Sequence, residues 1–294
     1  MSDPHFNKLC IIGIGLIGSS IARAARKHNL AKTIAIADSS AEALKEAEAL
    51  KLGDAYHADA GAAVRDADLT IICVPIGAYA AVGQAIAPNL KSGAILSDVG
   101  SVKQAVVRDL GPLVPEHVHF IPGHPVAGTE HSGPKAGFSE LFEGRWQILA
   151  PVPGTDEQAV GKLAAFWRAI GSNVEIMEPS HHDQVLAITS HLPHLIAYTI
   201  VGTATGLEGS TQREVIKFSA SGFRDFTRIA ASNPIMWRDI FLNNREAVLE
   251  MLGRFNEDLT ALQRAIRWGE GEKLEEWFTR TRAVRRSIID AKQA

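Results

Sequence analysis

Two segments of this chain carry the residue types best suited to chemistry. The first reads GIGLIG from Gly13 to Gly18 and follows the apolar run Leu9–Ile12. The second, Gly123–Glu130, places His124 between a glycine and a proline about a hundred residues later. Glycine-rich turns after a strand bind dinucleotides, and an imidazole can accept a hydroxyl proton while a hydride leaves. Together the segments predict a nicotinamide dehydrogenase with His124, in a tightly specified loop, as its base.

Each residue of the glycine-rich turn has an expected task. Gly13 allows a tight turn out of the strand, Gly15 lets the backbone approach a pyrophosphate, and Gly18 lets the following helix pack closely on the sheet. The helix that starts near Leu16 and Ile17 would offer free N–H groups and a positive dipole end to the phosphates. This context predicts dinucleotide binding more strongly than the bare motif does.

An acidic residue indicates which dinucleotide is bound. Asp38 comes 20 residues after Gly18, at the end of the apolar run Thr33–Ala37. Its carboxylate would bind the ribose hydroxyls and repel a 2′-phosphate, which favours NAD over NADP. The alternative is an ordinary turn aspartate. Val74 and Pro75, at the end of another apolar run, would form a wall of the adenine and ribose pocket.

Further polar candidates follow. Ser101, after the strand that ends at Asp98, would hold the substrate hydroxyl or orient a catalytic histidine, or would only cap a helix. His191 and His194 share one face at a helix start and suit a carboxylate-bearing ligand. A metal site is disfavoured there because no third ligand has a recognisable spacing. The adjacent His181 and His182 are interpreted as a solvated helix start, and a structural role remains the alternative for His124.

The segment from Gly222 to Trp237 adds candidates for an acidic substrate. Arg224 and Arg228 present planar groups suited to a carboxylate. Asp225 would hold Arg228 or gate the site. Ordinary surface ion pairs are the alternative explanation of the same residues.

The elements that must position these residues change in character along the chain. The first half alternates short apolar runs with helical patterns, as in a doubly wound parallel sheet. A helix is expected over Ala41–Leu50 and another from about Asp156 to Ile170, capped by Thr155 or Asp156. The expected strands are Lys8–Ile12, Thr33–Ala37, Leu69–Val74, Ala94–Asp98, His119–Ile121, Arg145–Ala150 and Asn173–Met177.

From Ser180 onward only helical patterns occur. We therefore expect a dinucleotide-binding domain over residues 1–178 and an all-helical domain over residues 179–294. Asn233 and Pro234 form an N-cap and first helical residue. Leu192–Leu207 is apolar but shorter than a membrane span requires, so a helix buried in a core or a subunit interface is expected. Turns are expected at 206–209, 219–222 and 232–234, and helical spacing relates Val248, Leu252, Phe255, Leu259, Leu262 and Ile266.

Bulk composition excludes several classes of protein. The 294 residues are 46% hydrophobic and carry a formal net charge of −3 with scattered basic residues, which argues against a nucleic-acid partner. Cys10 and Cys73 both lie in apolar runs, so buried thiols in a reducing compartment are expected. The apolar start, Leu9–Ala25, is better explained by the nucleotide turn than by a signal peptide. A cytoplasmic protein without membrane association is expected.

In these motifs the chain resembles the prephenate/arogenate (cyclohexadienyl) dehydrogenase family of tyrosine biosynthesis. The matching segments are GIGLIG, DVGSVK, GHPVAGTE, TSHLPH and GFRDFTRIAASNPIMW, in the family's order from residue 13 to 237. The resemblance implies a Rossmann-like domain followed by an all-helical dimerisation domain, hence a homodimer with a small-molecule substrate. Neither a fused chorismate mutase nor a regulatory ACT domain is expected.

The resemblance also implies roles for individual residues. His124 is similar to the catalytic histidine that accepts the proton of the ring 4-hydroxyl, and Ser101 to its hydrogen-bonding partner. Arg228 resembles the arginine that binds a substrate carboxylate, and His191 the histidine that lines the same pocket. Further pocket positions are implied for Thr129, Glu130, Trp237, Asp225 and, less directly, Arg224.

The implied reaction is NAD-dependent oxidative decarboxylation of prephenate, L-arogenate or both. Glu130 could favour the ammonium group of arogenate, and a broad enzyme that accepts both substrates is the preferred interpretation. One alternative is a β-hydroxyacid-type dehydrogenase, for which Lys217 lacks the expected glycines. The other is a non-catalytic nucleotide-sensing module, which would be expected to lose His124 or Arg228.

Overall fold

A computed structural model describes the chain except residues 1–4, 130, 207–213, 215–216, 219 and 291–294. It divides into two compact units, Met1–Arg245 and Glu246–Ala294. The strands are β1 Phe6–Ile12, β2 Ala31–Ala37, β3 Ala55–His57, β4 Leu69–Ile72, β5 Ile95–Asp98, β6 His119–Ile121, β7 Gly123–Pro125, β8 Trp146–Leu149 and β9 Asn173–Ile176. The α-helices are α1 Leu16–Lys27, α2 Ala41–Ala49, α3 Ala60–Ala63, α4 Tyr79–Ile86, α5 Lys103–Leu110, α6 Glu157–Ala169, α7 Pro179–Leu186, α8 Leu192–Thr205, α10 Ser221–Thr227, α11 Pro234–Asn243, α12 Arg245–Trp268 and α13 Gly271–Asp290.

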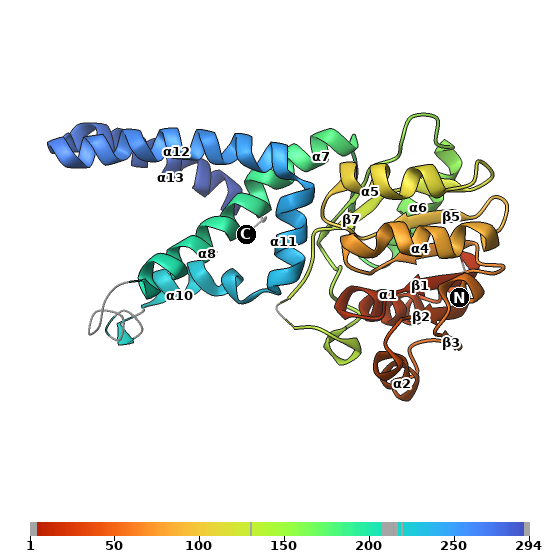
Figure 1. Cartoon of the computed structure of the whole chain (residues 1–294). Coiled ribbons are helices and arrows are strands. Elements are labelled where there is room, and N and C mark those ends of the chain that lie inside the picture. The colour runs from red at the N-terminus through yellow and green to blue at the C-terminus, as the bar shows by residue number, and fades with distance from the viewer. Residues whose placement is uncertain (1–4, 130, 207–213, 215–216, 219, 291–294) are drawn as a thin grey trace. The chain divides into compact units, whose positions relative to one another are not determined.

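The first unit is built on a six-stranded parallel sheet of order β3-β2-β1-β4-β5-β6 (Figure 1). This is the strand order of a dinucleotide-binding doubly wound fold, with the order reversing between β1 and β4. The predicted fold class, a Rossmann-like sheet followed by helices, is confirmed. All seven predicted strands are present within a few residues of their expected bounds.

Alternation along the strands fills two hydrophobic layers. On β1, Leu9 and Ile11 face a core shared with α1, α2 and α6. Cys10 and Ile12 face the opposite core, formed with α3, α4, α5 and α11. Successive strand side chains point to opposite faces, so a strand that is apolar throughout must be covered on both sides.

Two short strands were not predicted. β3 is a three-residue strand at the edge of the main sheet, paired only with β2 among the described strands. β7 belongs to a second, three-stranded sheet of order β7-β8-β9, in which it pairs antiparallel to β8. The prediction that Gly123–Pro125 is a loop is therefore wrong. Its glycine and proline indicated a turn, but proline is tolerated in a strand at a sheet edge.

The helical predictions hold in most places. Asp156 caps α6 by accepting hydrogen bonds from Gln158 and Ala159, and Asn233 caps α11 in the same way. The turn expected at 219–222 is wrong for Ser221 and Gly222, which begin α10, whereas residue 219 lies outside the described residues. Of the turn at 206–209, residues 207–209 also lie outside them.

The apolar segment before residue 207 is longer and less buried than expected. Pro179–Thr205 forms one helical run of 27 residues, long and apolar enough to cross a membrane by length and composition alone. Within α8 only Leu192 and Ala197 are buried, so the expectation of a helix buried in the core of this chain is wrong, and burial in a subunit interface stays a prediction. The start of the run instead contains buried polar residues that bond to α5 and to Asn244, as in the interior of a folded protein.

A π turn, Ala187–His191, interrupts this run between α7 and α8. Pro193 follows two residues later and has no N–H to donate to the preceding turn, which is a recognised cause of such irregularities. His191 occupies the N-cap position of α8, as expected for a helix start, although helical structure precedes it from Pro179. π turns occur often at functional sites.

Candidate active site

Ligands bind open α/β sheets at the carboxyl ends of the strands, where the strand order reverses. In this chain that place lies between β1 and β4, and the predicted nucleotide segments meet there. A Cβ atom added to Gly13 would lie 2.7 Å from the Cys73 carbonyl oxygen and 2.9 Å from a methyl group of Val74. The glycine-rich turn and the segment before Pro75 are thus in contact.

The three glycines differ in what surrounds them. Gly13 has a φ of +93°, in the region that favours glycine. A Cβ atom on Gly18 would lie 2.0 Å from the Gly13 carbonyl oxygen, whereas one on Gly15 would meet nothing within 4 Å. Gly18 is therefore in close contact with the backbone of Gly13, where a side chain would not fit. Gly15 leaves open space before the α1 N-terminus. No side chain caps that N-terminus and no acidic residue lies in its first turn, so Leu16 and Ile17 suit an anion.

Asp38 is attached to the same turn. One of its carboxylate oxygens accepts a hydrogen bond from the backbone N–H of Ile14 at 2.8 Å, and the other accepts one from Ser40 at 2.8 Å. The predicted ribose-binding carboxylate is therefore held beside the glycine-rich turn.

His124 lies on β7, which is joined to the end of β5 through buried polar contacts. Gly123 donates its N–H to the Asp98 carboxylate at 3.0 Å and accepts a hydrogen bond from the Lys103 ammonium group. Lys103 also pairs with Asp98 at 2.6 Å, and both side chains are fully buried. These contacts fix the backbone on which His124 stands.

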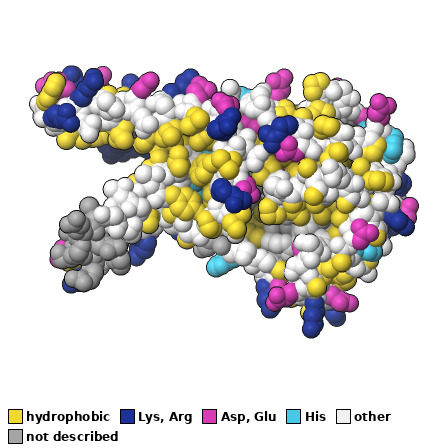
Figure 2. Space-filling view, viewed as in Figure 1, with side chains coloured by type: hydrophobic (Ala, Val, Ile, Leu, Met, Phe, Trp, Pro, Cys, Tyr) yellow, Lys and Arg dark blue, Asp and Glu magenta, His cyan; other side chains and the backbone are white. Residues whose placement is uncertain are grey.

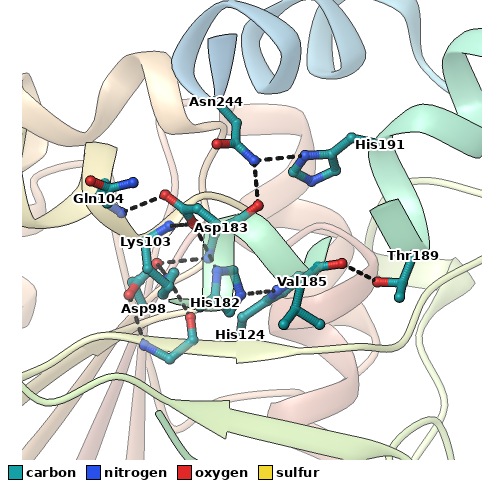
Figure 3. A network of polar contacts seen from close by, with 12 residues as sticks. Asp98, Lys103, Gln104, His124, His182, Asp183, Val185, Thr189, His191 and Asn244 are labelled. Atoms are coloured by element: carbon teal, nitrogen blue, oxygen red, sulfur yellow. Dashed lines mark hydrogen bonds and ion pairs between the residues drawn. The ribbon is translucent and has the colours of Figure 1, made fainter. Parts of the chain in front are cut away.

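The His124 ring is part of a chain of buried hydrogen bonds (Figure 3). Its Nδ1 lies 2.8 Å from Nε2 of His182, and Nδ1 of His182 lies 2.7 Å from the Asp183 carboxylate. His182 and Asp183 are both fully buried. The interpretation of His181 and His182 as a solvated helix start is correct for His181, which is exposed, and wrong for His182.

Ser101 is half-buried in the link between β5 and α5. The alternative role as a helix cap is not seen, because α5 begins at Lys103 and the residue at its cap position is Val102. The backbone N–H groups of Lys103 and Gln104 donate instead to Asp183 of α7. The partner of His124 Nδ1 in this structure is His182.

Burial lowers the pKa values of the site histidines. The pKa of His124 is well below its usual value, first because of burial and then because of His182, Lys103 and His191. Burial also lowers the pKa of His182, against the opposing effect of Asp183. Burial lowers the pKa of His191 to about 4. All three rings are therefore neutral at pH 7, the state that a proton acceptor requires.

A second cluster lies around Trp237 of α11. The His194 ring stacks on the indole with centroids 3.6 Å apart, and the His191 ring approaches it edge-on at 6.0 Å. Arg228 is close enough to lower the pKa of His194, after the larger effect of burial. The structure thus brings four of the residues predicted near a carboxylate ligand into one neighbourhood.

Two buried polar atoms in this cluster are unsatisfied. Asn244 donates through Nδ2 to the Asp183 carbonyl at 2.9 Å, and the same nitrogen lies 3.1 Å from Nδ1 of His191. Because an amide nitrogen only donates, neutral His191 carries its proton on Nε2. That Nε2 and the Trp237 Nε1 are buried without a hydrogen-bond partner among the described residues. Buried donors of this kind call for an acceptor.

The remaining predicted residues lie in less defined surroundings. Thr129 is exposed after β7 and accepts a hydrogen bond from the His131 N–H, while Glu130 lies outside the described residues. The exposed pair Arg224 and Asp225 lie 3.6 Å apart. Within the described part of the chain, no group of three or more candidate ligands could hold a metal ion.

Comparison with known proteins identifies the family. The family model described as prephenate dehydrogenase, nucleotide-binding domain, matches residues 21–176, and the model described as prephenate dehydrogenase, dimerization domain, matches residues 178–280. The chain belongs to the prephenate dehydrogenase family. This membership confirms the predicted family and the predicted NAD-dependent oxidoreductase class.

Individual relatives support the same assignment. The cyclohexadienyl dehydrogenase of Zymomonas mobilis is 44% identical over 283 residues, which is 96% of each chain. A solved prephenate dehydrogenase from A. aeolicus, in complex with hydroxyphenyl propionate and NAD+, has a TM-score of 0.89 and 32% identity, and covers 98% of this chain and 99% of its own. The Synechocystis arogenate dehydrogenase structure has a TM-score of 0.82 and 26% identity, and covers 96% of this chain and 99% of its own.

Sequence reasoning missed four polar residues of this site: Lys103, His182, Asp183 and Asn244. A buried lysine and a histidine–aspartate pair are polar residues in polar surroundings, so no hydrophobic pattern marks them. The available signal was their spacing, because His182, Asp183 and Leu186 form one face at the start of α7. This face points into the protein. The neighbouring His181 is exposed, and two adjacent histidines in the sequence give no sign that only one of them is buried.

Proposed function

We propose that this chain catalyses the NAD-dependent oxidative decarboxylation of prephenate and of L-arogenate, giving 4-hydroxyphenylpyruvate and L-tyrosine. The observation that carries the proposal is the buried, neutral His124, whose Nδ1 is hydrogen-bonded and whose Nε2 has no partner among the described residues. An imidazole with one nitrogen held and the other available suits a general base. Family membership supplies the class of reaction.

The residues present fit a bound dinucleotide. Gly15 leaves open space where a side chain would stand, and α1 begins there without a side-chain cap, so its first backbone N–H groups suit a phosphate. Asp38 is held beside this turn, where it would bind the ribose hydroxyls and disfavour a 2′-phosphate. We assign the nucleotide contacts to Gly13, Gly15, Leu16, Ile17, Gly18, Asp38, Val74 and Pro75. When bound, NAD accepts a hydride.

The proposed reaction balances with a single protein base. Nε2 of His124 takes the proton of the ring C4 hydroxyl while the C4–H bond breaks and its electron pair leaves as hydride. A ketone conjugated with the ring forms at C4. The bond between C1 and its carboxylate then breaks, CO₂ leaves, and the electron pair restores the aromatic ring. His124 returns the proton to the resulting phenolate oxygen, and aromatisation supplies the driving force.

We assign the substrate carboxylate to the cluster around Trp237. His191 Nε2 and Trp237 Nε1 are buried donors without partners in the described residues, and Arg228 adds positive charge near His194. A carboxylate would accept from these donors and satisfy them. A carboxylate bound there would orient the substrate ring toward His124. The two clusters are neighbours, because His191 is close enough to His124 to lower the pKa of the His124 ring. Ser101, Thr129, Glu130, Arg224 and Asp225 remain proposed site residues.

Acceptance of both substrates is the finer part of the proposal. Prephenate and arogenate differ in a keto group and an ammonium group on the side chain, far from the ring C4 at which His124 would act. The 44% identical relative named a cyclohexadienyl dehydrogenase supports a broad specificity.

We also propose a homodimer. The family model described as prephenate dehydrogenase, dimerization domain, matches residues 178–280. In the second unit, α12 and α13 leave large apolar side chains exposed, and Figure 2 shows hydrophobic side chains along α12. Those on α12 and α13 are Leu249, Leu259, Ile266, Trp268, Phe278, Val284 and Ile288. Extended apolar surface of this kind is typical of a protein interface.

The domain limits and location belong to the same proposal. We place the boundary near residue 178, where α7 begins at Pro179, and the family matches that end at 176 and begin at 178 support it. The division by compactness, after Arg245, falls later because α11 packs on the sheet domain. A cytoplasmic location fits a biosynthetic enzyme with two unpaired cysteines.

The decisive experiment measures initial rates of NAD reduction with prephenate and with arogenate, with NADP as a control. Turnover of both is expected. His124→Asn should lower kcat by about 10²- to 10⁴-fold with a modest change in KM, the usual share of a general base. The exposed neighbour of the site, His181→Asn, serves as the matched control. No turnover of either substrate by a protein that binds NAD would refute the proposal.

A further inference from the structure

We propose that His182 and Asp183 are positioning residues that fix the tautomer of neutral His124, so that the unprotonated nitrogen of the neutral ring is Nε2. The proposal rests on His124 being the base of the proposed reaction. His182 and Asp183 are more deeply buried than His124, and the sequence predicted no catalytic role for either residue.

The polarity begins at the Asp183 carboxylate. One of its oxygens accepts from the Lys103 N–H at 2.7 Å, and the other accepts from the Gln104 N–H at 2.9 Å. These N–H groups begin α5, where the helix dipole favours a negative charge. The Lys103 ammonium group adds a second positive charge near this carboxylate. Asp183 is thus surrounded by donors, and its oxygens act as acceptors.

An acceptor at this place determines the state of His182. Nδ1 of His182 lies 2.7 Å from the same Asp183 oxygen that accepts from Lys103, so it must carry a proton and donate it. Burial keeps the His182 ring neutral, because it lowers the pKa more than Asp183 raises it. A neutral imidazole with a proton on Nδ1 has a lone pair on Nε2. His182 therefore presents an acceptor to His124.

The acceptor on His182 in turn determines the state of His124. Nδ1 of His124 lies 2.8 Å from Nε2 of His182, and a hydrogen bond between them requires the proton on His124. With Nδ1 protonated, a neutral His124 has its lone pair on Nε2. No described residue bonds to that nitrogen, and it is not among the fully buried unpartnered atoms. The structure thus directs the basic lone pair away from the protein interior.

Charged and titratable groups on the neighbouring elements act on His124 and His182 in directions that agree with these proton positions. Lys103 of α5 and His191 of the π turn both lower the pKa of His124, and Lys103 also lowers that of His182. Asp98 of β5 and Asp183 of α7 raise the pKa of His182. Two protonated rings in contact would repel each other, so when His124 accepts a proton, His182 must stay neutral and keep accepting. The Asp183 carboxylate then stabilises the positive charge on His124 through the intervening ring of His182.

Two substitutions of His182 separate tautomer control from packing. Glutamine ends near the place of imidazole Nε2, and its oxygen can accept from His124, whereas asparagine ends near the place of Nδ1 and cannot reach His124. His182→Gln should keep kcat within about tenfold of the wild type, and His182→Asn should lose about 10²-fold. KM for the substrate and binding of NAD should change little in both. His181→Asn on the exposed side of α7 is the control.

Nuclear magnetic resonance provides a readout that does not depend on turnover. In protein labelled with ¹⁵N-histidine, two-bond ¹⁵N–¹H correlations distinguish protonated from unprotonated ring nitrogens, and His124→Asn identifies the His124 signals by their loss. The wild type at pH 7 should show Nδ1 protonated and Nε2 unprotonated, and His182→Asn should show a mixture of the two tautomers. A wild-type His124 protonated on Nε2 would overturn the proposal.

The kinetic arm can overturn the proposal as well. Equal losses in His182→Gln and His182→Asn would assign His182 a packing role. A wild type inactive on both substrates, with the expected tautomer, would instead refute the proposed function and leave the positioning role standing. The two failures are therefore distinguishable.

Discussion

The Lys103 ammonium group lies 2.6 Å from the Asp98 carboxylate, and neither side chain has any exposed surface. Asp98 also accepts from the Tyr79 hydroxyl and from the Gly123 N–H, while Lys103 donates to the Gly123 carbonyl. The ion pair thus connects β5, the start of α5 and β7. The strand that carries His124 is held by charged groups rather than by apolar packing alone.

Breaking this ion pair should destabilise the protein strongly. In Lys103→Met the Asp98 carboxylate would remain buried without its counter-ion, and such changes typically cost about 3–5 kcal/mol of unfolding free energy. Urea denaturation followed by tryptophan fluorescence measures the change. Lys27→Met is the control, because Lys27 forms surface ion pairs with Glu140 and Glu143, and its midpoint should barely move. A wild-type midpoint for Lys103→Met would contradict the prediction.

Two alanine substitutions in the nucleotide turn should have opposite effects. A Cβ atom on Gly15 meets nothing within 4 Å, so Gly15→Ala should fold with the wild-type melting temperature and bind NAD at least tenfold more weakly. A Cβ atom on Gly18 would lie 2.0 Å from the Gly13 carbonyl oxygen, so Gly18→Ala should lower the melting temperature itself. Thermal melts and NAD titrations by fluorescence compare them. Equal melting temperatures in the two variants would count against the assigned geometry.

Asp38 should control the choice of dinucleotide. In Asp38→Asn the charge that opposes a 2′-phosphate is lost, together with one hydrogen-bond acceptor of the pair that holds Ile14 and Ser40. The ratio of kcat/KM for NAD to that for NADP should fall by about tenfold or more. Ser40→Ala is the control, since it removes the α2 cap but leaves the carboxylate in place. An unchanged ratio in Asp38→Asn would indicate an ordinary turn aspartate.

The strands and helices that have a regular pattern of apolar residues could be predicted from the sequence. Most of the predicted strands are apolar runs with buried side chains, although β9 is mostly exposed. The caps Asp156 and Asn233 follow local hydrogen-bond chemistry. β3 and β7 were missed because AYH and GHP contain no Val, Ile, Leu or Phe to mark a short apolar run, whereas Phe120 and Ile121 mark β6. β7 also contains a glycine and a proline, and tertiary pairing with β8 overrides their local preference.

The site was predictable only where one residue type suits one chemistry. The glycine pattern, Asp38 and His124 have this property, since each occupies a recognisable place relative to a strand. His182 and Asn244 do not, because their places depend on which elements meet in space, and 62 positions separate them along the chain. The same limit explains why His182 was not predicted as the partner of His124 Nδ1.

Arg228 should contribute mainly to substrate binding. It lies near His194, which stacks on Trp237, beside the unpartnered donors assigned to the substrate carboxylate. Arg228→Gln should raise KM for prephenate by tenfold or more with a smaller change in kcat, because a charged contact to the carboxylate is lost. Arg238→Gln, which alters the ion pair of an exposed arginine with Asp239, is the matched control. A loss confined to kcat in Arg228→Gln would exclude the binding role.

His191 should contribute to the acid sensitivity of the fold. Burial lowers its pKa from the usual 6.5 to about 4, so between these values the unfolded chain binds a proton that the folded chain does not. Stability therefore rises with pH in this window and is lost as the pH falls from about 6.5 towards 4, with His191 accounting for about 3 kcal/mol. His124 and His182 act in the same direction, since their pKa values are also lowered.

The test is the slope of stability against pH rather than its absolute value. Urea unfolding of the wild type and of His191→Asn at several pH values from 7 to 4.5 gives that slope for each protein. His191→Asn should show a shallower slope below pH 6.5, because one titrating group fewer distinguishes the folded from the unfolded state. His181→Asn should keep the wild-type slope, since that ring is exposed. If His191→Asn retained the full wild-type slope, the buried neutral state assigned to His191 would be wrong, and with it the donor assigned to Nε2.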